Sequence, residues 1–257
     1  VSGRMKTQNG VTLVELILAL FIATLVFMGI FTTVNTAQRS SSGVEKRVAA
    51  QQDVRGALEL MAMEIQMASY NPDSLDNIWL DHTSANCASP ASTNLNFRGI
   101  RQATASAITI EMDINNSGSL LPLTSDDNPN EIITYVYDLA NRYITRSTNC
   151  GNAFAFLGDT AANQSRKTVL VVNDLNNNGI FDTGDIPVFR YFNGAGTDIT
   201  ATVVTNPTDL TVGIPAIRRI QVTLVADTAD VDAGSGVRRR IVYSTSVIPR
   251  NHFATVY

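Results

Sequence analysis

A run of oxygen-bearing side chains in the second half of the chain has the spacing of a calcium-binding loop. Across the twelve residues 174–185, oxygen donors stand at positions 1, 3, 5, 9 and 12, glycine stands at position 6, and position 7 offers a backbone carbonyl. Calcium takes six to eight oxygen ligands, and the glycine permits the sharp turn that wraps them around the ion. The predicted ligands are Asp174, Asn176, Asn178, Ile180, Asp182 and Asp185.

Two features of this loop predict weak binding. Asp185 stands where such loops usually carry a longer glutamate, and only three of the predicted ligands are carboxylates. We therefore expect an affinity in the micromolar-to-millimolar range. The alternative is a turn without metal, because the Asn178-Gly179 pair is a good hairpin connector. A second acidic run, residues 227–232, has no such spacing and is interpreted as a solvated turn.

Two cysteines, Cys87 and Cys150, are the remaining candidates for covalent or metal chemistry. In an exported domain an even number of cysteines predicts a disulfide, whereas two free buried thiols are the alternative. Both histidines, His82 and His252, lie outside any motif, and we expect them at the surface. A shared metal site on these residues is therefore not predicted.

The sequence predicts no enzyme. It contains no Gly-x-Ser-x-Gly, no His-Glu-x-x-His and no phosphate-binding glycine loop. The net charge of −4 and the scattered arginines do not indicate binding of nucleic acid. A group of aromatic side chains is interpreted as core rather than as a ligand platform; its members are Tyr135, Tyr137, Phe189, Tyr191 and Phe192.

The longest apolar stretch of the chain holds a single carboxylate. Residues 11–34 are long enough to span a bilayer as a helix, and Glu15 is the only formally charged side chain between Lys6 and Arg39. The run exceeds the apolar core of a secretory signal, and its small residue, Gly10, precedes it instead of following it. The basic leader predicts that the N-terminal side stays in the cytoplasm and that the rest of the chain is exported.

A carboxylate at membrane depth is costly and usually has a partner. One interpretation is that Glu15 lies near the interface and reaches water. The other is that it meets a positive group on a second chain, and cleavage after Gly10 would create such a group, the free amine of Val11. The residues alone leave both open.

The segment Gly10-Val11-Thr12-Leu13-Val14-Glu15-Leu16 resembles the processing site of type IV prepilins and type II secretion pseudopilins. The resemblance implies cleavage between Gly10 and Val11 by a prepilin peptidase, methylation of the new N-terminus, and pairing of Glu15 with the amine of a neighbouring subunit. Valine at position 11 departs from the more frequent phenylalanine or methionine, which puts the efficiency of methylation in doubt. We expect Met5 to start the leader.

The elements that must carry these residues follow from periodicity. Apolar residues at helical spacing continue the first run to Tyr70, including Val44, Val48, Val54, Leu58, Met61 and Ile65. We expect one nearly continuous helix over residues 11–70, with a hinge near 40–43 as the alternative. Strands are expected at 107–114, 131–137, 142–146, 168–172, 186–192, 217–226 and 238–247, with a hairpin joining the second and third and another joining the last two.

This order is similar to the pilin fold, an α+β architecture in which a long N-terminal helix packs on an antiparallel β-sheet domain. We expect a leader (1–10), a transmembrane or filament-core half-helix (11–36), an amphipathic half-helix (37–70) and an exported β-rich domain (71–257).

The segments 130–135 and 246–251 resemble PilW-type minor pilins and the related J-type pseudopilins. The resemblance implies a minor pilin that is anchored in the inner membrane and then joins a surface pilus near its tip, with other pilins as partners. A J-type pseudopilin of type II secretion is the nearest alternative. A signal-anchored enzyme or sensor is the alternative of another class.

Overall fold

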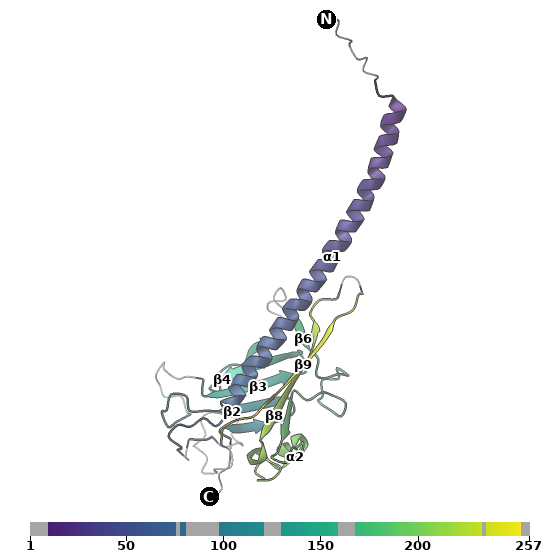
Figure 1. The fold of residues 1–257 in the computed structure, drawn as a ribbon. Coiled ribbons are helices and arrows are strands. Elements are labelled where there is room, and N and C mark those ends of the chain that lie inside the picture. Colours follow the sequence, from purple (N-terminus) through teal and green to yellow (C-terminus); the bar gives the residue numbers. More distant parts are fainter. Residues whose placement is uncertain are drawn as a thin grey trace.

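One helix dominates the molecule. The computed structural model describes residues 10–75, 78–80, 98–120, 130–158, 168–232 and 235–252. The helix α1 (Leu13–Gln66) projects away from the domain along its first half and lies against it along its second (Figure 1). It continues without a break through residues 40–43, so the single long helix is confirmed and the hinge is not.

The packed face of α1 begins later than the apolar pattern predicts. Its buried residues are Ala50, Val54, Ala57, Leu58, Met61 and Ile65. The predicted members Val44 and Val48 are instead 60% and 44% exposed. They are exposed because this stretch of α1 faces the loop after residue 228 across a groove and does not pack on a sheet.

The helix ends at Gln66, short of the predicted end at Tyr70. The amides of Met67 and Ala68 bond to carbonyls three residues back, at 3.1 and 3.2 Å, which tightens the last turn. Ser69 then adopts a positive φ of 67°, a conformation that does not continue a right-handed helix. Its amide turns to the carbonyl of Glu111 at 2.9 Å, so the chain passes directly from α1 to the first sheet.

Five strands form an antiparallel sheet in chain order. The predicted hairpin of residues 131–137 and 142–146 is confirmed, with Tyr135 opposite Arg146. The strands are β1 (Ile100–Ala103), β2 (Ala107–Glu111), β3 (Ile132–Asp138), β4 (Tyr143–Thr148) and β5 (Phe154–Leu157).

The second sheet is organised around one long strand. It comprises β6 (Val169–Val171), β7 (Phe189–Phe192), β8 (Arg219–Thr228) and β9 (Arg240–Val247). β9 pairs along one edge of β8, as predicted for the last hairpin, whereas β6 and β7 pair with the two ends of its other edge. The residues between β6 and β7 therefore leave the sheet halfway along β8.

The helix and both sheets share one hydrophobic core. α1 contacts β8 and β9 most closely, and the sheets approach each other where the amide of Val171 donates to the carbonyl of Arg142 at 2.9 Å. The α+β architecture with a long helix on antiparallel strands is confirmed. The strands divide into two sheets, because β6 and β7 take their partner from the C-terminal strand β8 and not from the preceding hairpins.

Four short elements lie in segments that the sequence pattern left irregular. They are β1, β5, the helix α2 (Thr200–Thr205) and the 3-10 turn η3 (Ile214–Ala216). Each has six residues or fewer, too few to show a hydrophobic period. η3 and α2 lie beside β1 and β7 and close that end of the core.

Candidate functional site

The predicted cleavage point lies in exposed chain ahead of α1. Gly10 and Val11 are exposed and outside the helix, and the N-cap residue Thr12 has extended backbone angles. An enzyme that binds a peptide by its backbone needs an extended segment, which a helix does not offer. The bond between Gly10 and Val11 is therefore accessible without unwinding α1.

Glu15 has a partner within its own chain. Its Oε2 accepts hydrogen bonds from the amide and the hydroxyl of Thr12, both at 3.0 Å, and its amide donates to the Thr12 hydroxyl at 3.3 Å. This capping box satisfies amides that a bilayer would leave unpaired. Thr-x-x-Glu is the sequence signature of such a box, and it predicts the contact from spacing alone.

The first half of α1 offers an apolar surface to its surroundings. It is long and apolar enough to cross a membrane, and its most apolar stretch is not buried against the rest of the chain. Large side chains such as Phe27 and Phe31 are about 70% exposed. A contiguous apolar surface of this extent requires lipid or other apolar chains around it.

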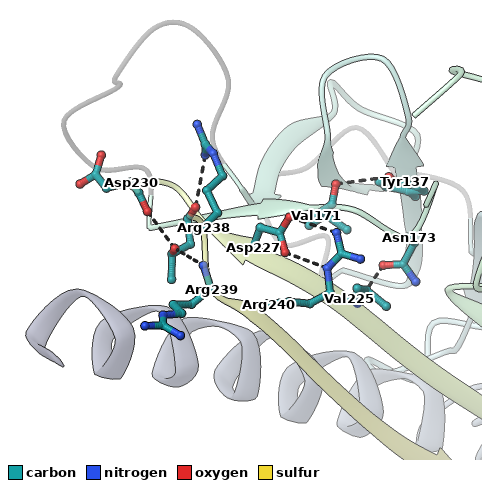
Figure 2. A network of polar contacts seen from close by, with 10 residues as sticks. Tyr137, Val171, Asn173, Val225, Asp227, Asp230, Arg238, Arg239 and Arg240 are labelled. Atoms are coloured by element: carbon teal, nitrogen blue, oxygen red, sulfur yellow. Dashed lines mark hydrogen bonds and ion pairs between the residues drawn. The ribbon is translucent and has the colours of Figure 1, made fainter. Parts of the chain in front are cut away.

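The loop 174–185 leaves the second sheet through a neck closed by Asn173. This buried side chain donates to the carbonyls of Ile186 and Thr223, both at 2.9 Å. It also accepts the amide of Val225 at 3.0 Å, the contact drawn in Figure 2. Asn173 thereby provides hydrogen-bond partners for backbone groups of β8 in the stretch that pairs with neither β6 nor β7. The local spacing of the loop does not predict Asn173, because its partners on β8 lie far along the chain.

Asp174 forms the base of the loop and is buried. Its carboxylate accepts the amides of Asn177 at 2.6 Å and Gly179 at 2.9 Å, and its own amide donates to the Tyr137 hydroxyl at 3.3 Å. Asn177 and Gly179 have positive φ angles of 56° and 76°, which turn their amides inward. The glycine at the sixth position therefore has the role that the spacing predicts.

The other predicted ligands form the rim of the loop. The carboxylate of Asp182 accepts the side-chain amides of Asn176 and Asn178, at 3.4 and 2.9 Å. The carboxylate of Asp185 accepts the amides of Leu175 and Asp182, both at 2.9 Å. All five predicted side chains thus take part in one hydrogen-bonded loop.

The donor chemistry of this loop fits a hard cation, because every predicted ligand is an oxygen. The carboxylates are nevertheless engaged with N–H groups, and in the described part of the chain no three His, Cys, Asp or Glu side chains gather as a metal site. Calcium would have to replace the N–H contacts of Asp182 and draw the amide oxygens of Asn176 and Asn178 inward. Calcium binding remains a prediction.

The second acidic run is neutralised by cations of the chain itself. Asp227 on β8 accepts two hydrogen bonds from Arg240 on β9, at 2.9 and 3.2 Å (Figure 2). Asp232 pairs with Arg239 at 2.9 Å, and Asp230 pairs with Lys46 of α1 at 2.8 Å. These carboxylates hold β9 and α1 beside the end of β8.

The expectation of a surface position is wrong for His252, which is 3% exposed. Its ring lies between the Ser69 hydroxyl, 3.2 Å from Nδ1, and the Ile214 carbonyl, 2.9 Å from Nε2, because the C-terminal segment folds back under the end of α1. Burial lowers the pKa of His252, and the carbonyls of Ile214 and Arg98 oppose this shift.

Three other predictions concern cysteine, histidine and the aromatic core. Cys87 and His82 lie outside the described residues, so the Cys87–Cys150 disulfide remains a prediction. Four of the five aromatic residues expected in the core are buried. The fifth, Phe192, is only partly buried, and the Arg219 guanidinium lies over its ring at 3.7 Å from the centroid.

A comparison with protein families gives one match. A family model described as the prokaryotic N-terminal methylation motif matches residues 5–31, which include the Gly10–Val11 bond, the capping box and the beginning of α1. No curated protein and no solved structure matched the chain. The match therefore covers both the exposed bond between Gly10 and Val11 and the exposed apolar beginning of α1.

Proposed function

We propose that this chain, whose methylation motif supports a type IV pilin-like family, is a minor pilin of a type IV pilus. In this proposal α1 anchors the subunit in the inner membrane until a prepilin peptidase cleaves after Gly10. The mature subunit then joins other pilins. The observation that carries the proposal is the apolar half of α1, which is exposed, preceded by the processing motif and continuous with a half that packs on the domain.

The same apolar surface suits two environments in succession. In the bilayer it faces lipid, and in the filament it faces the helices of neighbouring subunits. A position near the tip, where the subunit would start assembly, rests on the resemblance of segments 130–135 and 246–251 to PilW-type minor pilins.

The capping box gives Glu15 a role in both states. In the single subunit its carboxylate is bound by Thr12, so it enters the membrane with hydrogen bonds already made. In the filament the free amine of Val11 of a neighbouring subunit would offer a charged partner. In a low-dielectric core the full positive charge of that amine would attract the Glu15 carboxylate more strongly than the uncharged donors of Thr12 do.

Incorporation into sheared pili tests this proposal. Glu15→Ala is expected to insert into the membrane and to be processed, but to be lost from the pilus fraction. Glu45→Ala removes the same charge from an exposed position of the same helix and is the matched control. Thr12→Ala removes the cap but keeps the carboxylate, so it separates capping from pairing between subunits.

Each outcome of that experiment has a defined meaning. Normal incorporation of Glu15→Ala would show that the carboxylate does not guide assembly. Loss of Thr12→Ala to the same extent would assign the effect to the cap. Deletion of the protein with intact pili but blocked secretion of folded exoproteins would favour the J-type pseudopilin. Absence of the processed chain from any filament would favour an anchored enzyme or sensor.

We also infer that the loop 174–185 holds calcium and stabilises the exported domain. Its all-oxygen donor set, the turn at Gly179 and the rigid neck at Asn173 support this proposal. Calcium at millimolar concentration is expected to raise the thermal midpoint of the full chain in detergent. Asp174→Ala with Asp182→Ala should reduce that rise, whereas Asp73→Ala, an exposed change elsewhere, should not. A rise that is unchanged in the double variant would contradict the assignment.

A further inference from the structure

A second loop of the chain repeats the pattern of the loop 174–185. Residues 113–119 read Asp-Ile-Asn-Asn-Ser-Gly-Ser, and residues 174–180 read Asp-Leu-Asn-Asn-Asn-Gly-Ile. Aspartate, the two asparagines and glycine occupy the same positions, and the fifth position carries an oxygen donor in both. The loop 113–119 follows β2 of the five-stranded sheet, whereas the loop 174–185 lies between β6 and β7 of the other sheet.

The backbones of the two loops make corresponding hydrogen bonds. Oδ2 of Asp113 accepts the amide of Gly118 at 3.0 Å, just as Oδ2 of Asp174 accepts that of Gly179 at 2.9 Å. The positive φ angles recur as well, with Asn116 at 57° and Gly118 at 69°.

The oxygens at the rim of the second loop also correspond. The side chain of Asn115 accepts the amide of Ser117 at 2.9 Å, as Asn176 does for Asn178. The Ser117 hydroxyl lies 2.9 Å from the carbonyl oxygen of Ser119. The fifth- and seventh-position oxygens are thus already side by side, at a separation that suits two ligands of one cation.

The second loop differs from the first in having a buried acid beneath it. Glu131, just before β3, is 0% exposed, and its Oε1 accepts the amides of Ile114 and Asn115 at 3.2 and 3.4 Å. These bonds direct the side chain into the loop. Its other oxygen, Oε2, is buried and has no hydrogen-bond partner among the residues that the structure describes. A buried carboxylate oxygen is rarely left unpaired, so it points to a missing positive ligand.

The surroundings of this oxygen are negative. Asp113 is also 0% exposed, and in the described part of the chain neither it nor Glu131 forms an ion pair with lysine or arginine. Burial raises the pKa of Glu131, and the charge of Asp113 raises it further. A bound divalent cation would reverse both effects, because it compensates both carboxylates at once.

The position of Glu131 is fixed from both sides. Its amide donates to the Asn149 side chain at 3.0 Å, and its carbonyl accepts the amide of Met112 at 2.9 Å. The acid is therefore held by the first sheet under the loop and does not depend on the loop for its placement.

We propose that residues 113–119 and Glu131 form a second calcium site. Asp113, Asn115, Ser117 and the carbonyl of Ser119 supply the loop oxygens, and Glu131 supplies the closing carboxylate through Oε2. Calcium is favoured over softer metals because all donors are oxygens and no sulfur or imidazole is among them. Two carboxylates and an exposed rim predict dissociation constants of about 10⁻⁴–10⁻³ M. This proposal does not depend on the proposed role in a pilus.

The single tryptophan of the chain offers a local reporter. Trp79 packs with Leu120 and Ile132, the residues that flank the loop and Glu131. Calcium bound at this site is expected to change the emission of Trp79. Terbium bound in place of calcium is expected to luminesce when Trp79 is excited, because the nearby indole transfers energy to it.

The experiment uses the full chain in detergent, with the first loop disabled by Asp174→Asn and Asp182→Asn. In this background, titration with calcium to about 10 mM is expected to change Trp79 emission and to show about one bound calcium per chain by equilibrium dialysis. Adding Glu131→Gln should weaken this binding by about tenfold or more. Glu59→Gln, the same change at an exposed site of α1, should leave it unchanged.

A second variant guards against misfolding. Asn115 is exposed, so Asn115→Ala is expected to keep the fold by circular dichroism and still weaken calcium binding. Glu131→Gln should also remove the rise in thermal midpoint that calcium causes in the background chain. The proposal is overturned if the background chain binds no calcium at 10 mM, or if folded Glu131→Gln and Asn115→Ala chains both bind it with unchanged affinity.

Discussion

The two halves of α1 form one continuous helix but differ in what covers their apolar side chains. Residues 13–34 are exposed throughout, and within the described chain no apolar partner covers them. From Ala50 to Ile65 the buried face of the helix packs on the strands of the same chain. The first half therefore depends on lipid or on other subunits, whereas the second is completed by folding. Substitutions in the packed half should consequently lower the free energy of unfolding of the domain, whereas substitutions in the apolar half should leave it unchanged.

The largest difference is expected from equal truncations in the two halves. Met61 is fully buried and Met28 is exposed. Met61→Ala should lower the free energy of unfolding by about 2–5 kcal/mol, because it leaves a cavity in the shared core. Met28→Ala should leave the domain unchanged. Denaturant unfolding of the full chain in detergent, followed by Trp79 fluorescence, measures both. An equal loss for Met28→Ala would contradict the division of the helix.

A smaller loss is expected where a polar contact fixes the packed half. Glu64 binds Arg146 of β4 at 2.6 and 3.2 Å and also accepts the hydroxyl of Tyr135. Burial and the charge of Glu64 raise the pKa of Tyr135, so this hydroxyl remains a donor. Arg146→Ala leaves the mostly buried Glu64 carboxylate with Tyr135 alone.

We expect Arg146→Ala to destabilise the domain by about 1–3 kcal/mol in the same unfolding measurement. The matched control is Arg47→Ala, an exposed position on α1, which should stay within about 0.5 kcal/mol of the parent. A neutral Arg146→Ala would mean that the ion pair with Glu64 does not help to hold α1 on the first sheet.

The same division separates what the sequence could predict from what it could not. The apolar half, the hairpins and the loop 174–185 follow from residues near one another in the chain, so periodicity and spacing predict them. The single long helix was predictable because no proline interrupts residues 13–66 and apolar residues recur at helical spacing on both sides of the Ser-Ser-Ser-Gly segment at 40–43.

What the sequence missed depends on distant partners. β6 and β7 join β8 across long stretches of chain, and the sequence pattern did not predict this division of the strands into two sheets. Asn173 needs β8 for its hydrogen bonds, Glu131 needs the loop after β2, and His252 needs the end of α1. No local pattern marks such residues, since each looks like an ordinary surface residue until its partner is placed.

A third test concerns the end of the packed half, where His252 contacts Ser69. Because burial lowers the pKa of His252, the unfolded chain binds a proton at a pH where the folded chain does not. Acidification from the unperturbed pKa of about 6.5 toward the lower folded value should therefore destabilise the domain. The contribution of one proton cannot exceed about 1.4 kcal/mol per pH unit.

The measurement is unfolding free energy between pH 7 and pH 5 for the parent and for His252→Gln. The variant should show the shallower decline, since its side chain does not titrate. Carboxylates that titrate in the same range act on both chains, so the difference between the two slopes isolates His252. Parallel slopes would show that the pKa of His252 is the same in the folded and the unfolded chain, so that burial does not shift it.

The smallest effect is expected at the boundary between the halves. Lys46 lies just before the packed face of α1 and pairs with Asp230 at 2.8 Å, across the groove between the helix and the loop after β8. Both side chains are more than half exposed, so water screens the pair. A double-mutant cycle with Lys46→Ala and Asp230→Ala should give a coupling of about 0.2–1 kcal/mol that shrinks further in about 1 M salt. A coupling above about 2 kcal/mol that resists salt would show that the Lys46–Asp230 pair is shielded from water. The loop after β8 would then pack on α1 as the sheets do, and the packed half of the helix would begin nearer the N-terminus than Ala50.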